Sequence, residues 1–542
     1  MASALALACG SRKPQSGSAG SGVTNGQTGQ APKRGGVLNY AGGVAGSYDT
    51  RGVGYDPAVS LQFASKGFDL FYQRLLAYNL RSYVVEPELA QKWEQPSPTE
   101  YVFHLQPGVK WQKKPPVNGR ALSAQDIAYS LERARSNDPA FVNRSLLTSV
   151  DSFATPDTGT LNVTTKAPNA SELTVFAVDS LAIVAREVAE KYPKFGTADA
   201  AVGTGAFILK SAEEGVGAEY VRNPDYWRSG LPYLDGVRTK HFPDYLTAFS
   251  AFRAGQVDVS LMPGPAVKDY IAQQAAGFAP EWYPDDTMVF EYPNMRVKPM
   301  DDPRVVRAMR LLIDHDEFIK GWAEPQFGKG GYGSILPPAL ADWDLTPEEY
   351  KQHLEWKQPK DDASKEALSL LSAAGYTRDN PLKFGLLSLT DPPNAAAAQL
   401  LQAQWKRLSQ GAVDVELKLY DTATYTQIRN SHQFTYGHFG QSTGMVDPDI
   451  WFSTIYQTGA SQNHSGFSDS QVDAMITKQR ATFDEKERRT IVKQILLYMI
   501  DHGPSTICAT RYFLQGVNPK VQNHVPEYFL NGRLYETVWL KS

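Results

Sequence analysis

Two neighbouring stretches, 86-EPELAQKWEQPSPTEYVFHLQPGVKW-111 and 119-GRALSAQDIAYSLERA-134, say most about the fold. In the first, apolar residues alternate with polar ones before a Pro-Gly turn, at Tyr101, Phe103 and Leu105. Period-two alternation followed by a turn predicts a pair of strands. The second stretch carries a capping box and one apolar helix face, formed by Ser123 with Asp126 and by Ile127, Leu131 and Ala134. We therefore expect a β-hairpin followed by an amphipathic helix.

Outward from this point, helices and strands alternate along the chain. We expect strands at 37–40 and 413–420, and helices at 62–79, at 243–255, from Asp302-Pro303, from an Asn394 cap, and from Asp484 to about Asp501. The helix that begins at Pro303 should bury Val306, Met309 and Ile313. Such alternation predicts an α/β chain with mixed sheets.

Composition narrows the classes of function. The chain has 542 residues and 42% hydrophobic residues, enough to build several cores, and its length suggests three or four domains. Its net charge of −4 favours neither nucleic acid nor an anionic membrane surface as a partner. The sequence contains no run of 18 apolar residues, the length that a membrane-spanning helix needs.

The two cysteines, Cys9 and Cys508, stand nearly a chain length apart. This spacing supports neither a disulfide framework nor a thiolate metal site. Cys508 lies in an apolar, strand-like run, so we expect a buried and unreactive thiol there. The sequence has no HExxH motif and no clustered histidines. We therefore expect no metal and no cofactor.

The N-terminal segment is of a different kind. Residues 10–35 are rich in Gly and Ser and predict a flexible tether with a reach on the order of 25 Å. Residues 1–9 end in Ala-Leu-Ala-Cys, which resembles the end of a bacterial lipoprotein signal and implies lipidation of Cys9. No basic segment precedes the apolar run, so we expect that the signal is a remnant. The alternative is an incidental cysteine in a disordered tail.

One catalytic motif is present by spacing. GQSTG at 440–444 fits a nucleophile elbow with Ser442 as the nucleophile. An elbow requires a helix directly after the serine, and Pro448 disfavours helix at the residue before it. We therefore interpret the segment as a loop and expect no enzyme, with a surface serine hydrolase as the minor alternative. Aromatic residues in the predicted loops, including Trp451 and Tyr456, instead suit an apolar binding site between domains.

The chain resembles family five of the extracellular solute-binding proteins, the peptide/nickel type that delivers cargo to ABC importers. The two stretches quoted above look like the family signature. Further matching segments follow in the family's order: GTGAFIL (203–209), RNPDYWRSGLPYLDGV (222–237), AFRAGQVDV (251–259), DDPRVVRAMRLLIDHDEFI (301–319), LLSAAGY (370–376), NHSGFSDSQVDAMI (463–476) and FDEKERR (483–489).

The resemblance implies a periplasmic-binding-protein-like fold of type II (cluster C), with two main lobes of mixed sheet flanked by helices. Its implied domains are domain I (36–80, 202–288 and 505–542), domain II as an extra inserted lobe (81–201) and domain III (289–504). Two crossing segments, near Tyr292 and Pro504, would form a hinge. Cargo would be enclosed between domains I and III as they close.

The cargo is less defined. In peptide binders of this family an aspartate in the loop before a proline pairs with the peptide ammonium, and here Gly444 aligns with that aspartate. Asp447 and Asp449 flank Pro448 instead, so Asp447 would anchor a cationic ligand, or else serve as a turn or cap residue. We expect a peptide or similar small solute, with an oligosaccharide, an opine or a metal chelate as the alternative.

By loop position, the resemblance implies a set of ligand-binding residues: Tyr48, Tyr292, Asn294, Tyr436, His438, Gln441, Asp447, Trp451, Tyr456 and Asn463. The expected protein is a monomer that works outside the cytoplasmic membrane and is tied to it only through lipidated Cys9. Its expected partner is an ABC permease and not nucleic acid. A signalling receptor that presents its closed form to a membrane sensor is a further alternative.

Overall fold

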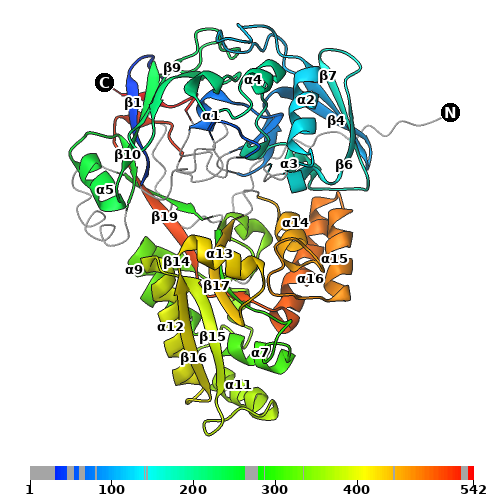
Figure 1. Ribbon diagram of the computed structural model, residues 1–542, viewed down its shortest axis with the longest axis vertical. Coiled ribbons are helices and arrows are strands. Elements are labelled where there is room, and N and C mark those ends of the chain that lie inside the picture. Colours follow the sequence, from blue (N-terminus) through cyan, green and yellow to red (C-terminus); the bar gives the residue numbers. More distant parts are fainter. Residues whose placement is uncertain are drawn as a thin grey trace, which may run out of the picture. The chain divides into compact units, whose positions relative to one another are not determined.

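The computed structural model (Figure 1) describes most of the chain. The described residues are 31–44, 54–59, 67–79, 82–138, 141, 144–262, 279–285, 287–333, 335–442, 446–525 and 535–541. Tyr48 and Cys9, which the sequence places in the ligand site and at the lipid anchor, lie outside them.

The hairpin and helix predicted from the opening stretches are confirmed. The hairpin belongs to a four-stranded antiparallel sheet with the order β4 (Ala90–Ser97), β5 (Glu100–Leu105), β7 (Thr160–Thr165) and β6 (Val150–Ala154). Helix α2 (Ala124–Ala134) follows, with the predicted capping box of Ser123 and Asp126. Phe103 and Ile127 are both fully buried. The alternating face of β5 and the apolar face of α2 therefore contribute to one core.

An eight-stranded mixed sheet gathers strands from distant parts of the described chain. Its order is β12 (Ala279–Pro284), β19 (Thr510–Val517), β11 (Val259–Leu261), β1 (Val37–Val44), β10 (Gly236–Phe242), β9 (Gly217–Arg222) and β8 (Phe207–Glu213), and β14 (Lys329–Gly331) pairs with β19. The structure explains why the GTGAF motif begins with a glycine. A Cβ on Gly203 would lie 1.8 Å from the carbonyl oxygen of Phe71, so the backbones meet too closely for any side chain.

A five-stranded mixed sheet carries much of the C-terminal half. Its order is β16 (Val413–Tyr420), β15 (Leu382–Leu389), β17 (Tyr436–Ser442), β13 (Thr287–Pro293) and β18 (Thr506–Ile507). Helices α7 (Pro303–Leu311), α11 (Asp361–Ala373) and α12 (Pro392–Leu408) share one core with the sheet. Trp405 of α12 is fully buried in it and donates its indole N–H to the carbonyl of Met309 at 3.0 Å.

Two short connections, at neighbouring places, carry the chain between these two sheets. By longer connections, β14, from the stretch between β13 and β15, also pairs with residues 510–512 of β19. One short passage runs from β12 to β13, around Asp285, and the other runs from β18 to β19, across residues 508–509. They lie a few residues from Tyr292 and Pro504. The Arg511 guanidinium forms an ion pair with the Asp285 carboxylate. The backbone N–H of Asp285 donates to the backbone carbonyl of Arg511 at 3.3 Å. The two passages are therefore fastened to each other.

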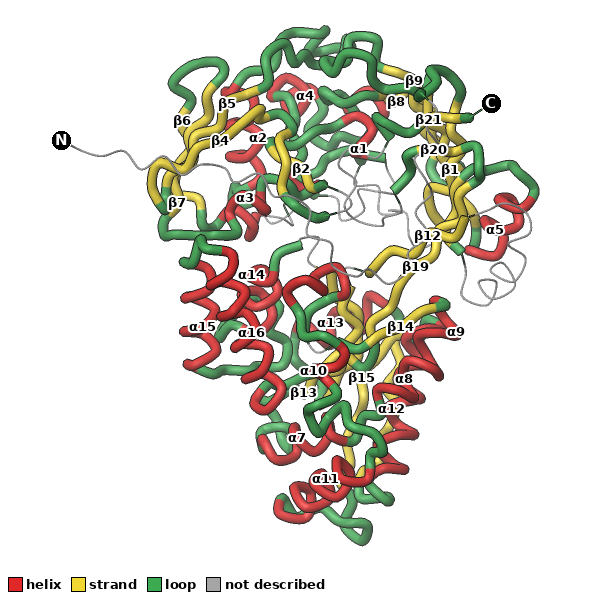
Figure 2. The backbone as a smooth tube through the Cα atoms, turned by 180° about the vertical axis from the view of Figure 1, so that it is seen from behind, coloured by secondary structure: helices red, strands yellow, loops and turns green. Residues whose placement is uncertain are grey.

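The remaining elements connect or cover these sheets (Figures 1 and 2). Two short antiparallel pairs are β2 (Leu76–Tyr78) with β3 (Val85–Pro87), and β20 (Val521–Gln522) with β21 (Trp539–Leu540). The other helices are α1 (Phe68–Phe71), α3 (Glu172–Val175), α4 (Arg186–Lys191), α5 (Tyr245–Arg253), α8 (His315–Phe318), α9 (Glu324–Phe327), α10 (Pro347–Tyr350), α13 (Thr422–Asn430), α14 (Pro448–Trp451), α15 (Ser470–Arg480) and α16 (Glu485–His502). Among the described residues, no helix is long and apolar enough to traverse a bilayer.

Two sequence predictions about helices were wrong. The helix expected at 62–79 is, within its described part, a single turn (α1) followed by strand β2. Gly67 adopts a left-handed conformation (φ 61°) at the start of α1, and nearly every apolar side chain after it is buried. Such all-round burial does not require helical periodicity. The cap of α12 is Asp391 and not Asn394, because Pro392 occupies the first helical position.

Candidate functional site

Strands β13 and β17 bring the first predicted ligand residues together. The two strands are antiparallel, with Tyr292 opposite Gly437 and Glu291 opposite His438. Because side chains alternate along a strand, the residues of each strand divide between the two faces of the sheet. The predicted ligand residues of this region therefore do not all point the same way.

Tyr292 lies on one face, in an aromatic cluster. Its hydroxyl is 2.6 Å from the hydroxyl of Tyr425, and its ring packs edge-on against Phe434 with centroids 5.6 Å apart. Burial raises the pKa of Tyr292 to about 12, so its phenol stays protonated. This face of β13 is a hydrogen-bonded aromatic layer.

Tyr436 and His438 lie on the other face, which α12 covers. The Tyr436 ring meets the Trp405 ring at a centroid distance of 5.1 Å. His438 is fully buried; burial, assisted by Arg511, lowers its pKa to about 3, which keeps the imidazole neutral. Neither of its ring nitrogens has a hydrogen-bond partner in the described part of the chain. These surroundings favour a structural role for both residues, and ligand contact by them stays a prediction.

The two predicted asparagines pin backbone turns. The Asn294 amide donates to the carbonyls of His432 and Phe434 at 3.0 and 2.9 Å. The Asn463 amide donates to the carbonyls of Gln457 and Phe467 at 3.1 and 2.8 Å. Both side chains are buried. Their amide N–H groups thus bond to the protein itself, which favours a positioning role for the loops that carry them.

Trp451 and Tyr456 are the predicted aromatic residues after the 443–445 segment, and both are buried. The Trp451 indole nitrogen has no partner among the described residues. The Tyr456 hydroxyl lies 3.4 Å from the Ser505 hydroxyl, next to the second passage. Gln441 and Ser442 are described only as part of the backbone of β17. The residue aligned with the family aspartate, Gly444, falls outside the described residues.

Asp447 is the best-defined polar residue of the predicted set. It begins α14, where it accepts the Asp449 backbone N–H at 2.8 Å. Its two oxygens accept from the Arg488 guanidinium at 2.9 and 2.5 Å, and Oδ1 also accepts from the Ser171 hydroxyl at 2.9 Å. Burial alone would lower the pKa of Arg488, but the Asp447 carboxylate outweighs it and raises that pKa. The predicted alternative role of Asp447 as a cap is therefore present, together with an ion pair.

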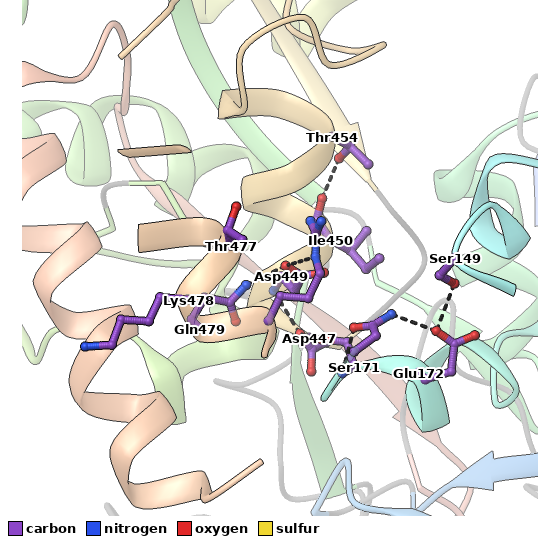
Figure 3. A network of polar contacts seen from close by, with 12 residues as sticks. Ser149, Ser171, Glu172, Asp447, Asp449, Ile450, Thr454, Thr477, Lys478 and Gln479 are labelled. Atoms are coloured by element: carbon purple, nitrogen blue, oxygen red, sulfur yellow. Dashed lines mark hydrogen bonds and ion pairs between the residues drawn. The ribbon is translucent and has the colours of Figure 1, made fainter. Parts of the chain in front are cut away.

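Further polar groups lie near Asp447, among them Asp449, Gln479 and Glu172 (Figure 3). Asp449 accepts from Arg480 at 3.0 Å and from Gln479, and Arg488 donates to Gln479 at 3.0 Å. From the opposite side, Glu172 accepts from Ser149 and Asn169 at 2.8 and 2.7 Å. Burial raises the pKa of Glu172 to about 7, and nearby Asp449 adds to the rise.

Ser171 and Arg488 were not among the predicted site residues. Arg488 lies in the FDEKERR motif, but Ser171 is 276 residues from Asp447 and no local pattern links them. No group of three or more His, Cys, Asp or Glu side chains in the described part of the chain could hold a metal ion. Cys508 is fully buried, as predicted, and donates its S–H to Glu291 at 2.7 Å.

Comparison with known proteins places this architecture. The structure of the periplasmic binding protein DppA from Helicobacter pylori, in complex with the peptide STSA, matches with a TM-score of 0.75 at 23% identity, over 94% of this chain and 99% of that one. The likeness confirms the α/β binding-protein fold that the sequence predicted. It gives the protein the fold of the α/β solute-binding proteins.

The chain belongs to the bacterial extracellular solute-binding proteins, family 5 Middle, whose model matches residues 84–463. It is 24% identical to the dipeptide-binding protein of Escherichia coli K12, over 84% of this chain and 86% of that protein. It is also 24% identical to heme-binding protein A of Haemophilus influenzae, over 88% of each. Membership in a family of extracytoplasmic, non-enzymatic binding proteins confirms the resemblance and rejects the hydrolase alternative at Ser442.

Proposed function

We propose that this protein captures a peptide or similar small solute between two lobes by hinge closure and delivers it to the permease of an ABC importer. The observation that carries the proposal is the pair of short, neighbouring connections between the eight-stranded and five-stranded sheets, β12 to β13 and β18 to β19. Two adjacent strand passages let one lobe rotate against the other with few backbone changes, as in hinged binding proteins. A ligand that contacts both lobes then favours the closed form.

The proposed domains are those implied by the resemblance: domain I (36–80, 202–288 and 505–542), domain II (81–201) and domain III (289–504). The grouping of strands supports this division. The four-stranded sheet is built wholly from residues within 81–201. Some short described strands depart from the division: β18 joins the five-stranded sheet, β14 joins the eight-stranded sheet, and β2 pairs with β3 across the boundary between residues 80 and 81. The proposed hinge is the pair of passages joined by Asp285 and Arg511.

A peptide is the first choice of cargo because one relative is a dipeptide-binding protein and a structurally similar protein was solved in complex with the peptide STSA. A metal chelate is the alternative that heme-binding protein A suggests. The Asp447 carboxylate already has an Arg488 partner, so it offers little free charge to a ligand ammonium. We therefore expect a ligand held through its backbone and apolar groups near this loop.

The proposal extends to the N-terminus and the assembly state. We propose a monomer that is lipid-anchored through Cys9 on the outer face of the cytoplasmic membrane. The Gly/Ser-rich sequence of residues 10–35 supports it as a tether. Mass spectrometry of the mature protein from its native host tests the anchor, because an unmodified Cys9 contradicts it.

Calorimetric titration tests the cargo. Protein freed of co-purified ligand by unfolding and refolding is titrated with a tripeptide, the same tripeptide N-acetylated, an oligosaccharide and hemin. We expect the free tripeptide to bind at micromolar level or tighter and acetylation to weaken it less than about tenfold, because the Asp447 carboxylate is already paired with Arg488. Binding of hemin or the oligosaccharide with no peptide binding would overturn the first choice.

A further inference from the structure

The segment before α3 contacts the α14–α16 region. This contact is separate from the two strand passages that connect the large sheets. The Ser171 hydroxyl donates to Asp447 at 2.9 Å and accepts from Arg488 at 2.8 Å. One residue earlier, the Ala170 N–H donates to the Arg480 carbonyl at 2.7 Å. Figures 1 and 2 show α3 beside α14, on the side of the chain away from β12 and β19. This contact lies opposite the proposed hinge.

The contact divides unevenly between its two sides. Asp447, Arg480 and Arg488 lie in proposed domain III and keep their ion pairs among themselves and with Asp449. In the described part of the chain, the segment before α3 contributes one hydroxyl and one backbone amide to these hydrogen bonds. Separating the sides therefore breaks neutral-group hydrogen bonds and leaves each charged pair intact. Such a contact can open and close without leaving a buried charge unpaired.

The contact is also dry. Ser171 is fully buried, and Asp447 and Arg488 are 3% and 5% exposed. Hydrogen bonds in such surroundings lose their partners entirely when the sides part, until water replaces them. The geometry is therefore sensitive to separation by even a small hinge rotation.

We propose that Ser171, with the Ala170 amide, forms a latch that stabilises the closed arrangement of the two sides. Ser171 is then a positioning residue: it changes ligand affinity through closure and does not contact the ligand. The proposal rests on the hinge-closure function proposed above. The apparent dissociation constant equals the intrinsic one divided by the fraction of molecules able to close, so a weaker latch weakens every ligand by one common factor. Loss of one or two hydrogen bonds corresponds to a factor of about two to ten.

The test compares Ser171→Ala with Ser149→Ala. Both remove a serine hydroxyl from the network in Figure 3, but Ser149 bonds to Glu172 on its own side and does not reach across. Spin labels are attached to cysteines introduced at the exposed positions Asp151 and Lys478, in a Cys9→Ser background. Double electron–electron resonance then measures the distance between the two labels, and so the separation of the two sides. Titration with the tripeptide, or with the ligand that the cargo test identifies, reports affinity.

We expect Ser171→Ala to shift the unliganded distances to larger values and to raise the dissociation constant about two- to tenfold. Ser149→Ala should leave both at the wild-type values. Unchanged distances in Ser171→Ala, or an equal shift in both variants, would overturn the latch. The distances are measured without ligand, so they judge the latch even if every solute fails to bind and the proposed function falls.

Discussion

Glu291 lies on β13, beside the proposed hinge, and its replacement by glutamine gives a sharp test of the buried electrostatics. Its side chain is fully buried and accepts the Cys508 S–H at 2.7 Å. Burial raises the pKa of Glu291 from 4.5 to about 8. Folding therefore takes up a proton at this residue between those two values, and the carboxyl is neutral in the folded protein at pH 7.

The sign of the effect follows from this raised pKa. The stabilising contribution of the protonated Glu291 is fully present below pH 4.5 and is lost as pH rises through about 8. A rise of 3.5 in pKa corresponds to about 5 kcal/mol of lost stability at pH 9. Glu291→Gln removes this dependence because an amide does not titrate. The variant should match the wild type at pH 5 to within about 1 kcal/mol and exceed it at pH 9.

Urea unfolding followed by tryptophan fluorescence at pH 5, 7 and 9 measures this difference. Glu100→Gln, at an exposed position on β5, is the matched control and should follow the wild type at all three pH values. A stability difference between Glu291→Gln and the wild type that stays constant or shrinks with rising pH would refute the reasoning.

Three further substitutions test other parts of the structure. Gly203→Ala should cost more than about 3 kcal/mol in unfolding free energy or prevent folding, because its Cβ would meet the Phe71 carbonyl, whereas Gly196→Ala, with nothing within 4 Å, should be near neutral by the same urea assay. Tyr292→Phe removes the 2.6 Å bond to Tyr425 and should cost about 1 kcal/mol; no loss of stability would contradict a bond between these hydroxyls. Glu172→Gln should stabilise the protein at pH 8 by up to about 3 kcal/mol and by much less at pH 4.5, since the pKa of Glu172 is raised to about 7; an equal effect at both pH values would contradict this.

Local signals predicted the elements that local physics decides. The alternation at Tyr101 and Phe103, the Ser123 capping box and the Asp302-Pro303 helix start each depend on residues a few positions apart, and the structure has all three. The prediction of a helix at 62–79 failed because burial on every side removes the periodicity that distinguishes a helix from a strand. Its pairing partner, β3, and the close backbone at Gly203 decide its conformation instead.

The candidate site was less predictable because its geometry is tertiary. Period-two alternation already puts Tyr436 and His438 on one face of β17 and Gly437 on the other. Which face α12 covers depends on the packing of Trp405, which no stretch of β17 encodes. The partners of Asp447 are harder still, because Ser171 and Arg488 come from segments far from it and from each other. Neighbouring residues predicted just one role of Asp447, that of the cap before Pro448.

The latch and the ligand residues should separate by thermodynamics even before a liganded structure exists. A latch acts only on the equilibrium between open and closed forms, so Ser171→Ala must multiply the dissociation constants of different ligands by the same factor. A residue that contacts ligand contributes differently to each, so its substitution changes their order. The ratio of affinities for the free and the N-acetylated tripeptide should therefore stay constant in Ser171→Ala. If that ratio changes while the unliganded distances do not, Ser171 acts on the ligand and not on closure.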